Sequence, residues 1–245
     1  MKIFLFTLIA LVACTSTTAA PDSSTKKLES ETELYTGKEY NNAFANPKDS
    51  DLPNVLLIGD SISIGYTVQV RKLLKGKADV FRIPGNGKFA AYGERNLDKW
   101  LGRRQWHVIH FNWGLWDICY RDPKSKNQGH RDKVNGTLTA TPKQYKDSME
   151  KIIIRLKKTK AKLIWCETTP VPELEVGRKL GEEIKYNKIA ETIMLSHKVA
   201  INKLHAHAML KTPGIFVGKG DVHFNAKGCK HLAEKVSQVI FKSLN

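Results

Sequence analysis

The feature that most constrains this chain is an alternation of short apolar runs with segments of helical periodicity, which begins at Pro53 and continues to the C-terminus. Short apolar runs between turn residues are typical of buried strands. Strands that alternate with helices favour βαβ units, in which a parallel sheet carries helices on both faces. We therefore predict an α/β fold, a three-layer α/β/α sandwich with about five strands. The expected strands are residues 55–58, 79–83, 107–112, 162–166 and, more weakly, 199–202.

Helices are expected between these strands, near residues 65–74 and 91–101, and before the fourth strand. The last of these has the clearest start: Thr141 is a plausible N-cap, Pro142 suits the first helical position, and Gln144 completes a capping box. A final helix is predicted over about residues 225–242. Its apolar stripe, which should pack on the sheet, consists of Cys229, Leu232, Ala233, Val236, Val239 and Ile240.

Residues 1–20 have the pattern of a secretory signal peptide. Lys2 precedes an apolar stretch over residues 3–13, which is too short to span a bilayer. Cleavage before Cys14 would be of the lipoprotein type, and cleavage after the Thr-Ala-Ala of residues 18–20 would be of the ordinary type; we favour the first. A lipid on Cys14 would hold the protein on a membrane surface. We expect an exported protein, either a periplasmic or cell-surface (outer-membrane) lipoprotein or a secreted one.

Residues 21–50 are polar, and we expect a linker or a loosely packed arm ahead of one domain over residues 51–245. Beyond the signal region the chain has three cysteines, Cys119, Cys166 and Cys229, an odd number that fits no disulfide framework. Cys166 lies in an apolar strand and is expected in the core, whereas the sequence allows a Cys119–Cys229 bridge without establishing it. The stretch 120–139 lacks apolar periodicity, and both a lid or binding loop and a solvated insertion fit it.

Chemistry-bearing residues follow several of the predicted strands, where parallel α/β sheets form their sites. A serine on a tight strand-to-helix turn can present its hydroxyl, and its N–H at a helix N-terminus can bind an anion. Paired glycines allow close backbone approach to a ligand. The segments are Gly-Asp-Ser at 59–61, Gly-Asn-Gly at 85–87, Asn-Trp-Gly-Leu-Trp-Asp at 112–117, and Gly-Asp-Val-His-Phe-Asn at 220–225.

These four segments, in this order, resemble the sequence blocks of the SGNH (GDSL-type) hydrolase superfamily, over most of residues 53–245. Thr-Thr-Pro at 168–170, followed by Tyr-Asn at 186–187, resembles the carbohydrate esterase branch. The resemblance implies a flavodoxin-like parallel sheet. It also implies a serine hydrolase that cleaves ester groups, acetyl first among them, from carbohydrate and needs no cofactor.

The resemblance also implies roles for individual residues. Ser61 would be the nucleophile, and His223 the general base that takes its proton and later protonates the leaving group. Asp221 would orient the imidazole and stabilise its charge. The oxyanion would be bound by the backbone N–H groups of Ser61 and Gly87 and by a side-chain amide.

Two blocks depart from the family pattern. The third normally reads Gly-x-Asn-Asp, but Trp116 stands where the asparagine is expected. We take Asn112 as the substitute donor and the indole N–H of Trp116 as the second choice. The last block is normally Asp-x-x-His, but here one residue separates Asp221 from His223. Asp221 must then reach through a different bend, or a carbonyl must orient His223 in its place.

Three further residues are candidates for substrate binding. Trp113 and Trp116 fit a sugar subsite and a place in the core equally well. Arg178 fits an anionic group of the substrate, or a solvated charge at a helix start. His205 and His207 form a weak metal pair, but no third ligand has suitable spacing, so we expect no metal.

The chain carries 40 Lys and Arg against 24 Asp and Glu, a net charge of +16. Such an excess attracts polyanions or a negative membrane surface, and in an exported hydrolase it favours an acidic polysaccharide over nucleic acid. Two alternatives remain open. One is a sulfatase of the same fold acting on an acidic glycan, and the other is a non-catalytic SGNH-like module that binds polyanions.

Overall fold

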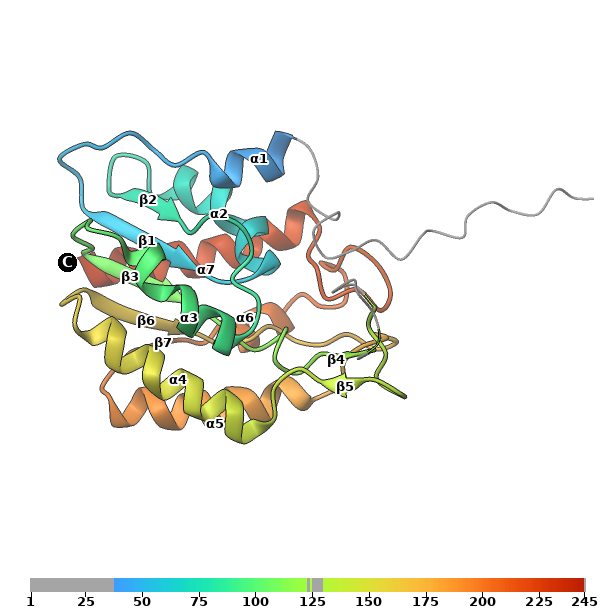
Figure 1. The fold of residues 1–245 in the computed structure, drawn as a ribbon. Helices are drawn as coiled ribbons and strands as arrows, with labels where there is room; N and C mark the ends of the chain where they lie inside the picture. Colours follow the sequence, from blue (N-terminus) through green and yellow to red (C-terminus); the bar gives the residue numbers. More distant parts are fainter. Residues whose placement is uncertain (1–37, 123, 125–129, 245) are drawn as a thin grey trace, which may run out of the picture.

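The computed structural model describes residues 38–122, 124 and 130–244. Its centre is a five-stranded parallel sheet with the strand order β2-β1-β3-β6-β7 (Figure 1). This architecture confirms the predicted α/β sandwich. The strands are β1 (Asn54–Ile58), β2 (Asp79–Arg82), β3 (Val108–Phe111), β6 (Lys162–Cys166) and β7 (Ala200–Asn202).

Helices cover both faces of the sheet (Figure 1). One face carries α2 (Ser61–Leu73) and α7 (Ala226–Leu244), with α1 (Lys38–Phe44) and α6 (Leu204–Met209) packed beside them. The other face carries α3 (Ala90–Leu101), α4 (Pro142–Lys157) and α5 (Glu182–Ser196). The predicted capping box of α4 is present, because the Thr141 hydroxyl accepts from Gln144 N–H and the Gln144 side chain accepts from Thr141 N–H.

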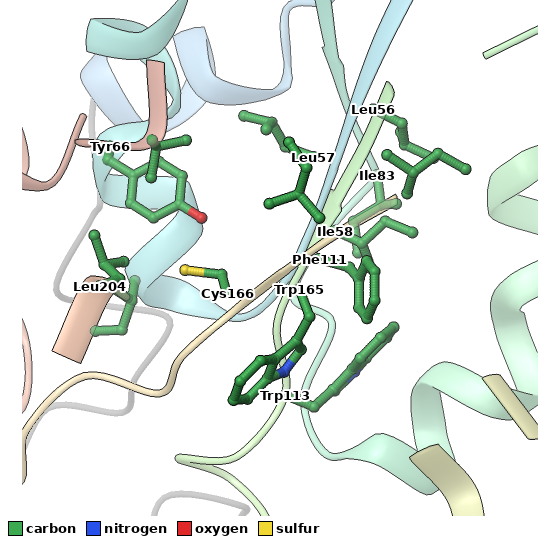
Figure 2. Close-up of a cluster of buried hydrophobic side chains, with 14 of the residues drawn as sticks. Leu56, Leu57, Ile58, Tyr66, Ile83, Phe111, Trp113, Trp165, Cys166 and Leu204 are labelled. Carbon is green, nitrogen blue, oxygen red and sulfur yellow. The ribbon is translucent and has the colours of Figure 1, made fainter. Parts of the chain in front are cut away.

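The core is divided by the sheet into two apolar layers (Figure 2). Leu57, Tyr66 and Cys166 lie on one side of the strands, and Ile58 and Phe111 lie on the other. Alternation of the side chains along each strand produces this division. It fixes the direction in which the residues that follow each strand can point, and therefore where a site can form.

Residues 38–50 differ from the linker or arm that we expected. Ala43 of α1 is fully buried, and α1 packs on α2. The Asn46 carboxamide accepts from Arg82 N–H at 2.9 Å, and Ser50 Oγ donates to the Asp79 carboxylate at 2.7 Å. β2 is an edge strand with unpaired backbone groups, so a polar segment that bonds to it can pack as part of the domain. The signal peptide and Cys14 lie outside the described residues.

Cys119, Cys166 and Cys229 are buried thiols, so the structure does not form the Cys119–Cys229 bridge that the sequence allows.

Within the stretch 120–139, β4 (Tyr120–Arg121) pairs antiparallel with β5 (Thr137–Leu138). Residues 123 and 125–129 of this stretch lie outside the described residues. In the described part of the chain, no helix is long and apolar enough to cross a membrane.

Candidate active site

Ser61 is the first residue of α2, and it follows the carboxyl end of β1 after a two-residue turn. Asp60 is the N-cap, and its carboxylate accepts from Ile62 N–H at 3.0 Å. The N–H of Ser61 has no acceptor among the described residues. A backbone donor at the start of a helix is suited to binding negative charge.

The structure brings Ser61 together with His223, which lies 162 positions away in the segment before α7. Ser61 Oγ lies 2.8 Å from His223 Nε2, and His223 Nδ1 lies 2.7 Å from Asp221 Oδ1. A carboxylate can only accept, so it holds the proton on Nδ1 and leaves Nε2 to accept from the Ser61 hydroxyl. This is the geometry of a serine nucleophile with an oriented base.

The Asp221 carboxylate makes the short Asp-x-His spacing workable. Its Oδ1 accepts from the backbone N–H of His223 at 2.9 Å as well as from the ring. Burial raises the pKa of Asp221, but the hydrogen bonds from His223 and the charge of Arg131 outweigh burial and leave the pKa below its usual value. Asp221 is therefore ionised at neutral pH. The shorter Asp-x-His segment therefore bends in a turn that Asp221 Oδ1 closes by accepting from both N–H groups of His223.

Arg82 is a residue of the site that the sequence reasoning missed. It comes from β2, is 2% exposed, and its guanidinium joins the loop after β2 to the nucleophile turn after β1. An arginine inside the otherwise apolar run 80–83 was the signal that could have found it. Its five hydrogen bonds go to the carbonyl oxygens of Ile83, Gly85, Gly59 and Asp60 and to Ser63 Oγ.

Two of the three oxyanion donors that we predicted are already bonded. Gly87 N–H donates to Gly59 O at 2.9 Å. The Asn112 amide donates to Cys166 O at 2.7 Å and to Thr168 Oγ1 at 3.3 Å, which uses both of its hydrogens. Asn112 therefore ties β3 to the segment after β6. Of the three predicted donors, the Ser61 N–H alone has no acceptor within the described structure.

Several side-chain donors are buried without an acceptor among the described residues, and two of them, Asn86 Nδ2 and Trp116 Nε1, belong to the segments that follow β2 and β3. The Asn86 carboxamide is oriented, because its oxygen accepts from Lys88 N–H at 2.8 Å. Trp116 lies under the Arg121 guanidinium, 4.3 Å from the ring centroid. An unsatisfied buried donor costs about 1–3 kcal/mol. Such donors therefore call for a functional explanation.

The predicted substrate-binding residues are buried. Trp113 is fully buried, its indole donates to Gly87 O at 3.0 Å, and it packs so closely on Gly93 that a Cβ there would overlap the ring. Trp116 is 4% exposed, so neither ring is an open platform for a sugar.

Arg178 is 1% exposed and pairs with buried Glu175 at 3.0 Å. Its charge is neutralised inside the protein, which corrects the expectation of a role in binding an anionic substrate.

The two histidines of the weak metal pair do not form a site. His207 stacks on His231 with ring centroids 3.9 Å apart, and each ring bonds to the other residue's carbonyl oxygen. His205 instead bonds to the Glu183 carboxylate at 3.4 Å. Over the residues that the structure describes, no group of three potential metal ligands occurs.

Asp117, the aligned acid of the third block, is fully buried, and its carboxyl accepts from Ala90 N–H at 2.9 Å at the start of α3. Burial is the main cause that raises its pKa from 3.8 to about 8. The folded protein therefore holds a proton that the unfolded chain releases above about pH 4. Through this group, stability falls as the pH rises from about 4 to about 8.

Asp117→Asn should flatten that part of the stability profile, because an amide does not titrate and its oxygen can still accept from Ala90 N–H. The measurement is urea unfolding at pH 4, 6 and 8. Asp147→Asn is the control, because the hydrogen bond from Lys143 lowers the pKa of this exposed carboxylate, so its pH dependence lies below about pH 4 and the slope between pH 4 and 8 should stay as in the wild type. An Asp117→Asn profile with the wild-type slope would refute the assignment.

Comparison with known proteins identifies the fold. No family model and no curated protein sequence matches the chain. A solved acetyl xylan esterase aligns with a TM-score of 0.61 at 18% identity, over 76% of this chain and 99% of that one. A lipase/acylhydrolase from Enterococcus faecalis gives 0.63 at 16% identity, over 78% and 96%. An acetylxylan esterase from Geobacillus stearothermophilus gives 0.62 at 16%, over 77% and 94%. The chain thus has the fold of the GDSL-type hydrolases, as the resemblance implied.

Proposed function

We propose that this protein is an ester hydrolase that removes O-acetyl groups from carbohydrate, with Ser61 as the nucleophile. The observation that carries the proposal is the chain of contacts from Ser61 Oγ through His223 to Asp221, at 2.8 and 2.7 Å. The acetyl and carbohydrate parts are supported by the acetylxylan esterases among the proteins of the same fold.

The reaction begins as Ser61 Oγ attacks the ester carbonyl carbon while its proton moves to His223 Nε2. The bond from that carbon to the sugar oxygen then breaks, and His223 gives the proton to the departing oxygen. Water attacks the resulting acyl-serine, His223 takes and returns a proton in the same way, and acetic acid and Ser61 are released. Asp221 stabilises the imidazolium that forms in each half-reaction.

The negative oxygen of each tetrahedral intermediate needs donors, and we assign it the Ser61 N–H and Asn86 Nδ2. The loop that carries Asn86 is held against the nucleophile turn by the bond from Gly87 N–H to Gly59 O and by Arg82. Asn86 Nδ2 is buried and lacks an acceptor among the described residues, as a donor reserved for a transient charge would. The indole N–H of Trp116 is the second choice, because it also lacks one.

Asn86→Asp should lower kcat by about 10²-fold, since one oxyanion donor is worth roughly 10²–10³ in kcat. The variant removes the donor but keeps an oxygen for Lys88 N–H, so the loop should hold its path. Steady-state kinetics on an acetyl ester check this. An unchanged kcat would exclude Asn86, and the matching loss in Trp116→Phe would then transfer the role to Trp116.

The proposed activity is tested by incubating the full chain with acetylated xylan and with a sulfated polysaccharide, and measuring released acetate and sulfate. We expect acetate alone, together with labelling of Ser61 by a fluorophosphonate probe. Sulfate release would replace the acetyl assignment with a sulfatase. Neither product, with Ser61 unlabelled, would replace it with a non-catalytic module.

We also propose that the enzyme is exported and anchored to a membrane surface by a lipid on Cys14. The proposal rests on the apolar stretch 3–13 and on the Leu-Val-Ala-Cys sequence at 11–14. Fractionation of cells that produce the full chain checks it. Cys14→Ser should move the protein from the membrane to the soluble fraction, and an unchanged distribution would exclude the lipid.

A further inference from the structure

A cationic hollow lies at the amino ends of β6 and β7, the opposite end of the sheet from Ser61. Its volume is about 400 Å³. The ends of α4, α5 and α7 meet there beside the start of β6 (Figure 1). We call its apolar lining the floor, which consists of Ala161, Leu163, Val199 and Ala200. We call its polar lining the rim, which consists of Lys157, Lys162, His197, Lys198 and Ser243.

The hollow has a single sign of charge. Its lining includes three lysines and no acidic side chain. Lys158 and Lys160 follow on the same turn, and all five lysines are exposed. None of them has an ion-pair partner among the described residues, whereas Lys143 and Lys146 at the other end of α4 pair with Asp147 and Glu150. Unpaired cations around a concave surface concentrate the field on whatever enters it.

The backbone supplies an independent observation. Lys160 and Lys198 have φ values of 61° and 56°, in the left-handed region where glycine is the favoured residue. They occupy the turns that follow α4 and α5, and these two turns border the same hollow. Both turns therefore have a lysine at a position where glycine would avoid backbone strain. Strain of this kind clusters at functional sites.

We propose that this hollow binds a segment of a linear acidic polysaccharide, with sulfate or carboxylate groups on the lysines and a sugar ring over the apolar floor. A concave site with an apolar floor suits a sugar unit better than a flat membrane surface. Binding here would hold a polymer on the protein away from the nucleophile. The proposal does not rest on the esterase reaction, because the hollow shares no residue with it.

Binding is measured by calorimetry on the full chain carrying Ser61→Ala, so that hydrolysis cannot change the ligand. The probes are a sulfated oligosaccharide, a polygalacturonate oligomer and a neutral xylo-oligosaccharide. We expect at least one acidic probe to bind and the neutral one not to bind. Lys162→Gln with Lys198→Gln should weaken binding at least about tenfold and flatten the slope of log K against log salt by about 1–2. Lys143→Gln with Lys146→Gln removes the same charge and should change neither value appreciably.

A second pair of variants tests the role of the strained lysines. Lys198→Gly should raise Tm, by roughly 1–3 °C, while weakening acidic-glycan binding. Leu174→Gly, at another exposed left-handed position with φ 64°, should raise Tm without affecting binding. Equal losses in the two double-lysine variants would overturn the site in favour of diffuse net charge. Binding to anionic phospholipid vesicles but to neither acidic probe would overturn it in favour of a membrane surface.

Discussion

Ser61→Ala should lower kcat for acetyl ester hydrolysis by about 10³–10⁶-fold, the largest effect expected of any single substitution in this protein. The hydroxyl lies 2.8 Å from the base and is 3% exposed, so neither water nor a neighbouring side chain replaces it easily. The expected loss lies in kcat, because the variant keeps the backbone N–H of residue 61 and the rest of the site. Steady-state kinetics with acetylated xylan provide the measurement.

Ser63→Ala is the matched control for this prediction. Ser63 is also buried in the first turn of α2, but its hydroxyl donates to Asp60 O and accepts from Arg82. Removing it should reduce stability and cost far less activity than Ser61→Ala. Thermal unfolding of both variants separates folding from chemistry. Near wild-type turnover in Ser61→Ala would remove Ser61 as the nucleophile.

Substitutions of Asp221 should show the second largest effect, with an order that follows from the double role of its Oδ1. In Asp221→Asn, the two N–H donors of His223 favour an amide oxygen at the same place. The proton then stays on Nδ1, and only the negative charge is lost. Asp221→Ala loses both orientation and charge. We expect kcat to fall by about 10–10²-fold in Asp221→Asn and about 10³–10⁴-fold in Asp221→Ala.

The check is kcat as a function of pH for both variants, with circular dichroism to show that each folds. Equal losses in the two variants would mean that the amide turns its NH₂ toward the ring and imposes the wrong tautomer. A fully active Asp221→Ala would mean that another group orients His223.

The sequence allowed prediction of the features that depend on local pattern and chain order. Apolar runs defined the strands, and block order placed Ser61 and His223 at one edge of the sheet. The direction and the contacts of individual side chains could not be predicted from the sequence. Asn112 looked available as a donor until the structure showed its amide bonded to Cys166 O, 54 residues away. Trp113 looked suitable for a sugar until the contact with Gly93 in α3 showed it to be core.

The prediction of a loosely packed arm was wrong for residues 38–50, and the role of Arg82 was missed, for a related reason. Residues 38–50 are polar, and polarity predicted weak packing, but Asn46 and Ser50 bond to an edge strand whose position depends on the whole sheet. Arg82 lies in a strand, and only the three-dimensional path of two loops reveals that their carbonyl oxygens converge on its guanidinium. The contacts of Asn46 and Ser50 with β2 span 36 and 29 positions, and the bond from Arg82 to Gly59 O spans 23, so no local window of sequence contains them.

Arg82 has a consequence for redesign of the specificity of this protein. Four of its five acceptors are main-chain oxygens, which every amino acid carries. A library that varies side chains at Ile83 or Pro84 would therefore leave the coupling between the two loops in place. An insertion or deletion at the same positions would break it, since the oxygens would no longer meet one guanidinium. The bonds of Arg82 therefore constrain the length of the loop after β2 rather than its amino-acid composition.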